Sequence, residues 1–406
     1  MSDNHASDPA VPEPAVAAES LPPRGGRFRL PSRRATIAIA AGAVALILAI
    51  AIPVGIAVQQ SNAANARYDD ALADRTDAAT SLQSLVDDAD ELMGFAADYV
   101  VIADDTLAAA ADGYVGAEQK AALAASRDAL AAAADAVTGF DTTVPTLGER
   151  PTGVSELDAA TAELTAETPA LTSRADDLTT AVAELATEMH GTMTAGDALI
   201  ATIRPSADAL LAANYSAENL VHISYVSVVD SVEASLYWSG ELAPEIANYV
   251  TAAQQLQASH ASEEAQKAGP LYGQRVAVEA FARSIAGGVL LDFDWAPIVN
   301  GYGDGNGYGG YSTWNTAAPG YSTVSLSNSV AELWGVNSAV ASLVAHEIGH
   351  SITSKCYDLF STAFDSQDEV WATAWAIGMG YSEDGSGESI YGRPTDAQIA
   401  LTMQCR

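Results

Sequence analysis

Five leucines recur at intervals of seven residues in the middle of this 406-residue chain, and no other feature limits its fold as strongly. An apolar residue at every seventh position gives a helix a continuous stripe that packs against other helices, as in coiled coils and helix bundles. Pro169 lies inside the repeat and predicts a kink or a break in the helix. The five leucines are Leu157, Leu164, Leu171, Leu178 and Leu185.

A second apolar stripe with three- and four-residue spacing predicts another amphipathic helix upstream of the leucine repeat. Helical patterns then continue to about residue 268, so residues 59–268 are expected to form a helical bundle or coiled-coil stalk. Two functions stay open for this region: a spacer, or a bundle that senses a ligand, self-associates or binds an envelope partner. The residues of the upstream stripe are Leu82, Leu85, Val86, Ala89, Leu92, Met93 and Ala96.

Residues 35–58 form a nearly all-apolar run without a charge, and five arginines precede it. About 20 apolar residues in a helix cross the hydrocarbon core of a bilayer, and flanking positive charge stays on the cytoplasmic side. We therefore predict a disordered cytoplasmic tail at 1–34, a transmembrane helix at 35–58, and an extracytoplasmic remainder of a single-pass cell-membrane protein. The alternatives are a cleaved signal peptide, since Ala64-Asn65-Ala66 fits a cleavage site, and a buried globular helix.

The charge balance excludes one class of partner. The chain has 18 Lys and Arg against 52 Asp and Glu, a formal net charge of −34. Such a chain repels nucleic-acid phosphates, so no nucleic-acid partner is expected. Its two cysteines, Cys356 and Cys405, both follow the predicted membrane helix, and in an oxidising compartment they predict a disulfide.

The composition changes after residue 268, where Gly269 and Pro270 mark a boundary and tryptophan and glycine become frequent. We expect a small α+β domain at 269–406, which makes the whole chain mostly α. The expected elements are a helix at 274–286, strands at 289–293 and 322–327, a glycine-rich loop at 301–310, and then two helices and a C-terminal segment.

The motif His346-Glu347-Ile348-Gly349-His350 carries the chemistry. Apolar residues repeat every four positions from Val336 to Ile352, which predicts a helix. Histidines four residues apart project from one helix face and can share one Zn²⁺ ion. Glu347 lies near the same face, where it can take a proton from water at the metal.

This segment resembles the zincin metallopeptidases, over about residues 270–406. The metzincin branch needs a glycine and a third histidine where this chain has Thr353 and Cys356, so the resemblance is to the gluzincin branch. That resemblance implies hydrolysis of peptide or protein substrates, with Zn²⁺ as cofactor and Glu347 as general base. It also implies a third ligand about twenty residues on, and Glu369 lies 19 residues after His350.

Other assignments of the third ligand remain open. Glu369 also fits a capping box that begins at Ser366, and Asp365, Asp368 or Cys356 are alternative ligands. The family often places an Asp four residues after the ligand Glu, where this chain has Thr373, and Asp365 or Asp368 are the substitutes that the sequence offers.

The family also implies a donor for the oxyanion and a strand that pairs with extended substrate. No histidine follows His350, so the donors are Tyr381, Tyr391 and Arg393, of which we select Tyr391 as a catalytic residue. The strand at 322–327 is the candidate for substrate pairing, or an ordinary sheet strand. The leading hypothesis is a membrane-anchored extracytoplasmic zinc peptidase, and the alternative is a catalytically inactive zincin-like adaptor that acts through its helical bundle.

Overall fold

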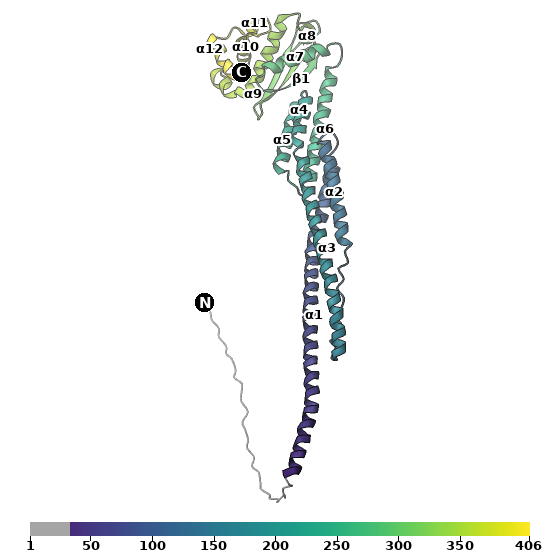
Figure 1. The fold of residues 1–406 in the computed structure, drawn as a ribbon. Helices are drawn as coiled ribbons and strands as arrows, with labels where there is room; N and C mark the ends of the chain where they lie inside the picture. Colours follow the sequence, from purple (N-terminus) through teal and green to yellow (C-terminus); the bar gives the residue numbers. More distant parts are fainter. Residues whose placement is uncertain (1–32) are drawn as a thin grey trace, which may run out of the picture. The chain divides into compact units, whose positions relative to one another are not determined.

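The computed structural model describes the backbone of residues 33–406 and the side chains from Val54 onward, except Ser235. The predicted tail at 1–34 therefore lies almost entirely outside the described residues. The first two thirds of the described chain are helical (Figure 1). The helices are α1 (Arg33–Ala109), α2 (Ala117–Thr138), α3 (Val154–Ile200), α4 (Ile203–Ala213), α5 (Asn219–Ser235) and α6 (Leu242–Lys267).

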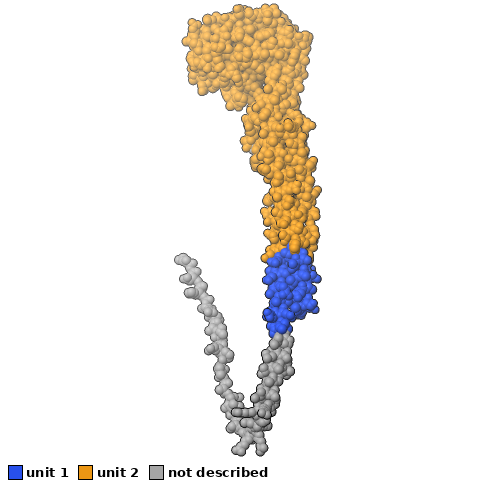
Figure 2. All heavy atoms as spheres, in the orientation of Figure 1, with its two compact units in different colours: residues 1–76, 146–168 blue, residues 77–145, 169–406 orange. Residues whose placement is uncertain are grey.

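The chain divides into two compact units, coloured separately in Figure 2. One comprises residues up to Thr76 together with Thr146–Thr168, and the other comprises Asp77–Pro145 together with Pro169–Arg406. This division cuts through the predicted stalk and does not separate it from the C-terminal region. The domain boundary between residues 268 and 269 therefore stays a prediction.

The leucine repeat forms the buried stripe of α3, as its spacing predicts. Leu157 and Leu164 are buried in the first unit, and Leu171, Leu178 and Leu185 in the second. Of the kink or break expected at Pro169, the break is absent, because α3 continues through this residue to Ile200. Burial of the leucines on both sides of the proline offsets the single helical hydrogen bond that its missing N–H removes.

The predicted transmembrane helix at 35–58 is wrong, and so is the single-pass localisation derived from it. The segment belongs to α1, a single helix of 77 residues that continues far beyond residue 58. Along the part of the chain that the structure describes, no helix combines the length and the apolar character that a membrane span requires. The described side chains of α1, from Val54 onward, include Asp69, Asp74, Asp87 and Asp98, and charged side chains are unfavourable in the hydrocarbon core of a bilayer.

The C-terminal region begins with α7 (Tyr272–Ile285) and contains five short strands, four further α-helices after α8, and a closing 3₁₀ turn. The helix expected at 274–286 matches α7. The remaining elements are β1 (Leu290–Ala296), β2 (Ile298–Val299), β3 (Tyr302–Gly303), β4 (Gly310–Asn315), β5 (Tyr321–Ser327), α8 (Asn328–Leu333), α9 (Ser338–Ala363), α10 (Asp368–Gly378), α11 (Glu388–Tyr391), α12 (Asp396–Thr402) and η1 (Met403–Cys405).

The main sheet has the strand order β1-β5-β4, with β1 parallel and β4 antiparallel to β5. This order corrects one expectation, because β5 covers the segment 322–327 that was the candidate for substrate pairing. Its two edges already carry the hydrogen bonds to β1 and β4, so it has no edge left for a peptide. Strand β4 was not predicted, and it is the edge strand next to α9.

One core joins the sheet to the helices beneath it. Leu291 and Phe293 of β1 and Val324 and Leu326 of β5 are buried against the apolar side of α9. At the far end of α9, Cys356 and Cys405 lie at disulfide distance, with sulfur atoms 2.00 Å apart. The expected pairing is therefore present, and it joins η1 to α9.

Replacing a buried leucine of the repeat tests this packing. We expect Leu178→Ala to lower the free energy of unfolding by about 2–5 kcal/mol, because it leaves a cavity in the helical core. Leu220→Ala is the matched control, since Leu220 is 64% exposed and its truncation should change stability by less than about 0.5 kcal/mol. Urea denaturation followed by circular dichroism measures both, and equal effects would contradict the assigned core.

Candidate metal centre

Helix α9 carries the two motif histidines and is fixed by its own apolar stripe. Val340, Val344, Ile348 and Ile352 are all fully buried, whereas Val336, the first residue of the predicted stripe, lies before the helix and is 81% exposed. The helix begins with a side-chain cap, because Asn337 accepts a hydrogen bond from the backbone N–H of Ala339. His346 and His350 are also buried, at 4% and 6% exposure.

Helix α10 approaches α9 at backbone distance, which brings its first turn to the histidines. A β-carbon placed on Gly349 would come within 2.8 Å of the backbone of Ala372, so only glycine fits at this crossing. Trp371 strengthens the contact by donating its indole N–H to the carbonyl of Gly349 at 2.9 Å. The small residue Ala372 of α10 thus allows the two helices to pack closely.

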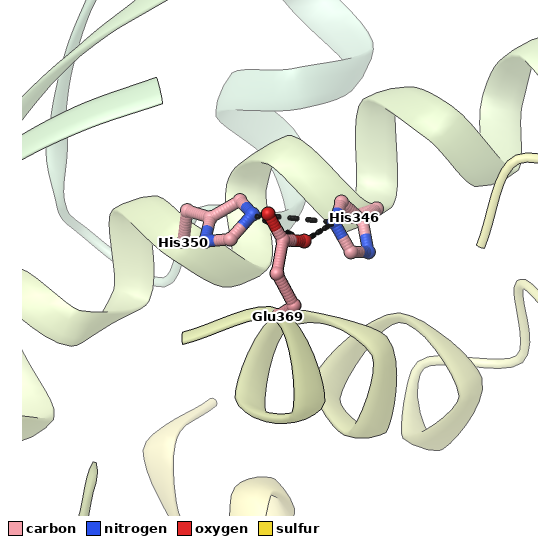
Figure 3. A group of neighbouring side chains, drawn as sticks. All are labelled: His346, His350 and Glu369. Atoms are coloured by element: carbon pink, nitrogen blue, oxygen red, sulfur yellow. Dashed lines mark hydrogen bonds and ion pairs between the residues drawn. The ribbon is translucent and has the colours of Figure 1, made fainter. Parts of the chain in front are cut away.

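The structure brings together the three residues that were selected as metal ligands (Figure 3). The Nε2 atoms of His346 and His350 lie 3.2 Å apart. The Oε2 atom of Glu369, which rises from α10, lies 3.1 Å from Nε2 of His346 and 3.5 Å from Nε2 of His350. Two imidazoles and a carboxylate that converge in this way form a group able to hold a metal ion.

The other ring nitrogen of each histidine has its own acceptor. Nδ1 of His346 donates to the carbonyl of Ser386 at 2.9 Å, and Nδ1 of His350 donates to the carboxylate of Asp368 at 2.9 Å. These bonds fix the ring orientations and leave Nε2 of each neutral ring as the metal-facing atom. Asp368 therefore takes the supporting role that the sequence left open between it and Asp365.

The capping-box alternative for Glu369 is not observed. Helix α10 begins at Asp368, and its N-cap residue Gln367 makes no side-chain cap hydrogen bond. Ser366 instead has a left-handed backbone, with φ of 57°. The carboxylate of Glu369 is free of any capping role and reaches the two imidazoles.

The carboxylates of Asp368 and Glu369 favour positive charge at the two histidines. Burial alone would lower the pKa of His350, but hydrogen bonds to Asp368 and Glu369 raise it to about 10. Burial alone would raise the pKa of Glu369, yet its bonds to the two histidines hold it well below its usual range. A carboxylate that stays ionised between two imidazoles is the arrangement that a divalent cation needs.

Glu347 faces a cavity of about 400 Å³ beside the histidines. The side chain is 4% exposed, and this burial raises the pKa of its carboxyl. Ser312 of β4 donates a hydrogen bond to its Oε2 atom at 3.1 Å. The cavity is also lined by the glycine-rich segment 307–310 and by Tyr302, Leu343, Ile390 and Tyr391.

Tyr391 is the only one of the three proposed oxyanion donors that lines this cavity. Its ring stacks on that of His346, with centroids 6.0 Å apart and planes at 10°. Burial and the nearby carboxylate of Glu369 raise its pKa to about 12, so the phenol keeps its proton at neutral pH. Arg393 instead pairs with Glu388 on the surface, and Tyr381 packs edge-on against Phe281.

Two groups that contact the site residues, the Ser386 carbonyl and the Ser312 hydroxyl, were not predicted from the sequence. The carbonyl of Ser386 comes from an irregular loop, and no side-chain pattern predicts which backbone oxygen meets a histidine. Ser312 lies on the unpredicted strand β4, whose sequence Gly-Tyr-Ser-Thr-Trp-Asn shows no alternation of apolar and polar residues; the alternation of buried and exposed positions is seen only in the structure. Cys356 is paired with Cys405, which removes it from the alternative ligands.

No protein-family model, curated protein or solved structure matches this chain.

Asp368→Asn tests the support of His350. The amide is a weaker acceptor than the carboxylate, so the ring loses orientation and basicity, and we expect the affinity for Zn²⁺ to fall about 10–100-fold. Asp365→Asn is the control, because Asp365 is exposed like Asp368 but lies three residues before the start of α10, and it should leave the affinity unchanged. Competition with a chromophoric chelator measures both, and an equal loss in the two variants would contradict the role of Asp368.

Proposed function

We propose that this protein is a zinc-dependent peptidase that hydrolyses peptide bonds in extended polypeptide segments. The observation that carries the proposal is the convergence of His346, His350 and Glu369 next to a buried Glu347 at the wall of a cavity. The ligands, the base and the space for a substrate thus occur at one place.

The spacing of the three ligand atoms supports zinc. Zn²⁺ binds imidazole nitrogen and carboxylate oxygen at 2.0–2.2 Å in a tetrahedron, whose ligand-to-ligand edges are then about 3.3 Å. The three separations in this protein are 3.1, 3.2 and 3.5 Å. Three protein ligands leave the fourth position of a tetrahedron open, as in catalytic rather than structural zinc sites.

A zinc ion at this group supplies a Lewis acid that polarises a peptide carbonyl and makes water more acidic. Glu347 accepts a proton from the attacking water, whose oxygen bonds to the carbonyl carbon. When the C–N bond breaks, Glu347 returns this proton to the departing nitrogen, so the elements of water are added across the bond. The raised pKa of the buried Glu347 carboxyl suits it both to accept the proton from water and to donate it to the nitrogen.

Strand β4 gives the substrate a place to bind. It is an edge strand of the sheet, and its residues Gly310 and Ser312 lie against Glu347. A peptide that adds to such an edge is held by backbone hydrogen bonds in an extended form. The cavity beside it is lined by exposed apolar groups, Ile390 at 73% and Tyr302 at 52%, so large apolar substrate side chains are expected there.

Tyr391 is the proposed donor to the carbonyl oxygen as negative charge develops on it. Its phenol stays protonated because its pKa is raised to about 12, and its ring is held against His346. A preorganised donor of this kind stabilises the transition state more than the ground state.

Removing the third ligand tests the zinc site. We expect the full chain to bind one Zn²⁺, and Glu369→Ala to lose most of that affinity because two histidines alone hold the ion poorly. Glu383→Ala, an exposed residue of the same region, is the matched control and should bind as tightly as the wild type. Metal content after gel filtration measures all three, and full retention of zinc by Glu369→Ala would contradict the ligand assignment.

Removing the base tests the chemistry. We expect the zinc-loaded chain to cleave a quenched fluorescent peptide library, with activity lost on chelation and restored by Zn²⁺. Glu347→Gln should keep its zinc but cleave about 10²–10⁴-fold more slowly, because an amide cannot accept the proton. Glu163→Gln on the exposed side of α3 is the matched control.

The outcome separates the two hypotheses about function. Zinc-dependent cleavage that Glu347→Gln abolishes supports the peptidase. A zinc-loaded wild type that cleaves none of the library would contradict it and favour the inactive zincin-like adaptor.

A further inference from the structure

The carboxylate of Glu347 lies directly against the first residue of β4. A β-carbon built on Gly310 would come within 2.4 Å of Oε1 and 2.6 Å of both Cδ and Cγ of Glu347. Real β-carbons essentially never make contacts this short, so any side chain at residue 310 displaces the glutamate. Gly310 has no left-handed backbone that would by itself require glycine, so the constraint is the space that Glu347 occupies.

The next residue on the same face of β4 supplies a hydrogen bond. Side chains alternate along a strand, so Gly310 and Ser312 face the same side, while Tyr311 faces the other and is 51% exposed. Ser312 is buried and donates from Oγ to Oε2 of Glu347 at 3.1 Å. Gly310 and Ser312 therefore both act on the carboxylate of Glu347: Gly310 leaves space for it, and Ser312 donates a hydrogen bond to it.

The beginning of β4 is itself held in place. Nδ2 of Asn300 donates to the carbonyl of Gly310 at 2.9 Å. Just before the strand, Gly309 forms two bonds with Ser327, which accepts at Oγ from the Gly309 N–H and donates its own N–H to the Gly309 carbonyl, both at 2.9 Å. These hydrogen bonds hold the backbone of residues 309–310 in a fixed position relative to Glu347.

We propose that Gly310 and Ser312 are positioning residues that fix the carboxylate of Glu347 in its orientation for proton transfer. This inference rests on the proposed peptidase function. Strand β4, whose free backbone edge is the proposed binding place of the peptide, also positions the general base Glu347 through Gly310 and Ser312. One strand therefore sets both the register of the peptide and the place of the base.

The test uses two variants of the full zinc-loaded chain. Gly310→Ala should displace the carboxylate and lower kcat about 10²-fold, the scale expected when a catalytic group is misplaced by about 1 Å. Ser312→Ala removes the hydroxyl without adding bulk, and should lower kcat about tenfold while KM stays within about twofold. Both variants should keep one Zn²⁺ per chain and the melting temperature of the wild type.

Two controls and one double variant make the test specific. Gly273→Ala adds a methyl where no atom lies within 4 Å, and Ser325→Ala removes a hydroxyl from β5 next to the buried Val324 and Leu326. Both should retain wild-type kcat. In a Glu347→Asp background the carboxylate is withdrawn from β4, so adding Ser312→Ala should cost little more; a further tenfold loss would show that Ser312 acts independently of Glu347.

Crystal structures of the zinc-loaded wild type and both variants provide a readout that needs no activity. We expect the Glu347 carboxylate to lie against Gly310 in the wild type and to turn away from β4 in the variants. An unmoved carboxylate in both variants, or an unchanged kcat when it has moved, would overturn the positioning role. A wild type without peptidase activity would contradict the proposed function, and the crystal structures would still decide whether β4 orients Glu347.

Discussion

The contact between α9 and α10 is the interaction on which the candidate site depends. Gly349 lets the backbone of Ala372 approach to a distance that any larger residue would prevent, and Trp371 fastens the crossing through its bond to the Gly349 carbonyl. This crossing places Glu369 opposite His346 and His350, two residues that α9 alone would only align along its own face. A larger residue at position 349 would thus separate the ligands without touching any of them.

The site places negative charge next to the two buried histidines. Asp368 and Glu369 raise the pKa of His350 although burial opposes this, and burial raises the pKa of Glu347. The same charges that favour a proton on His350 favour a divalent cation between the two histidines, since both are positive. Metal binding is therefore expected to displace that proton, so the affinity for metal should weaken as the pH falls.

Features that depend on residue spacing within one helix were predicted from the sequence. Features that depend on contacts between distant segments were not. The seven-residue repeat fixes which face of α3 is buried, and the four-residue spacing of the histidines fixes that they share a face. Both rules follow from the geometry of one helix. Strand β4 was missed because its six residues do not alternate between apolar and polar types, and Ser386 because it contributes a backbone oxygen. The membrane prediction rested on the apolar composition of 24 residues alone, and no helix along the described residues has the length and the apolar character of a span.

Zinc K-edge X-ray absorption of the full chain loaded with one equivalent of Zn²⁺ tests the central claim most directly. Ligation by His346, His350 and Glu369 predicts four nitrogen or oxygen neighbours at about 2.0 Å, with the outer-shell scattering of two imidazoles. The imidazole signal should fall by half when either histidine is replaced. A sulfur neighbour at about 2.3 Å, or a shell of oxygen atoms without imidazole scattering, would contradict the account.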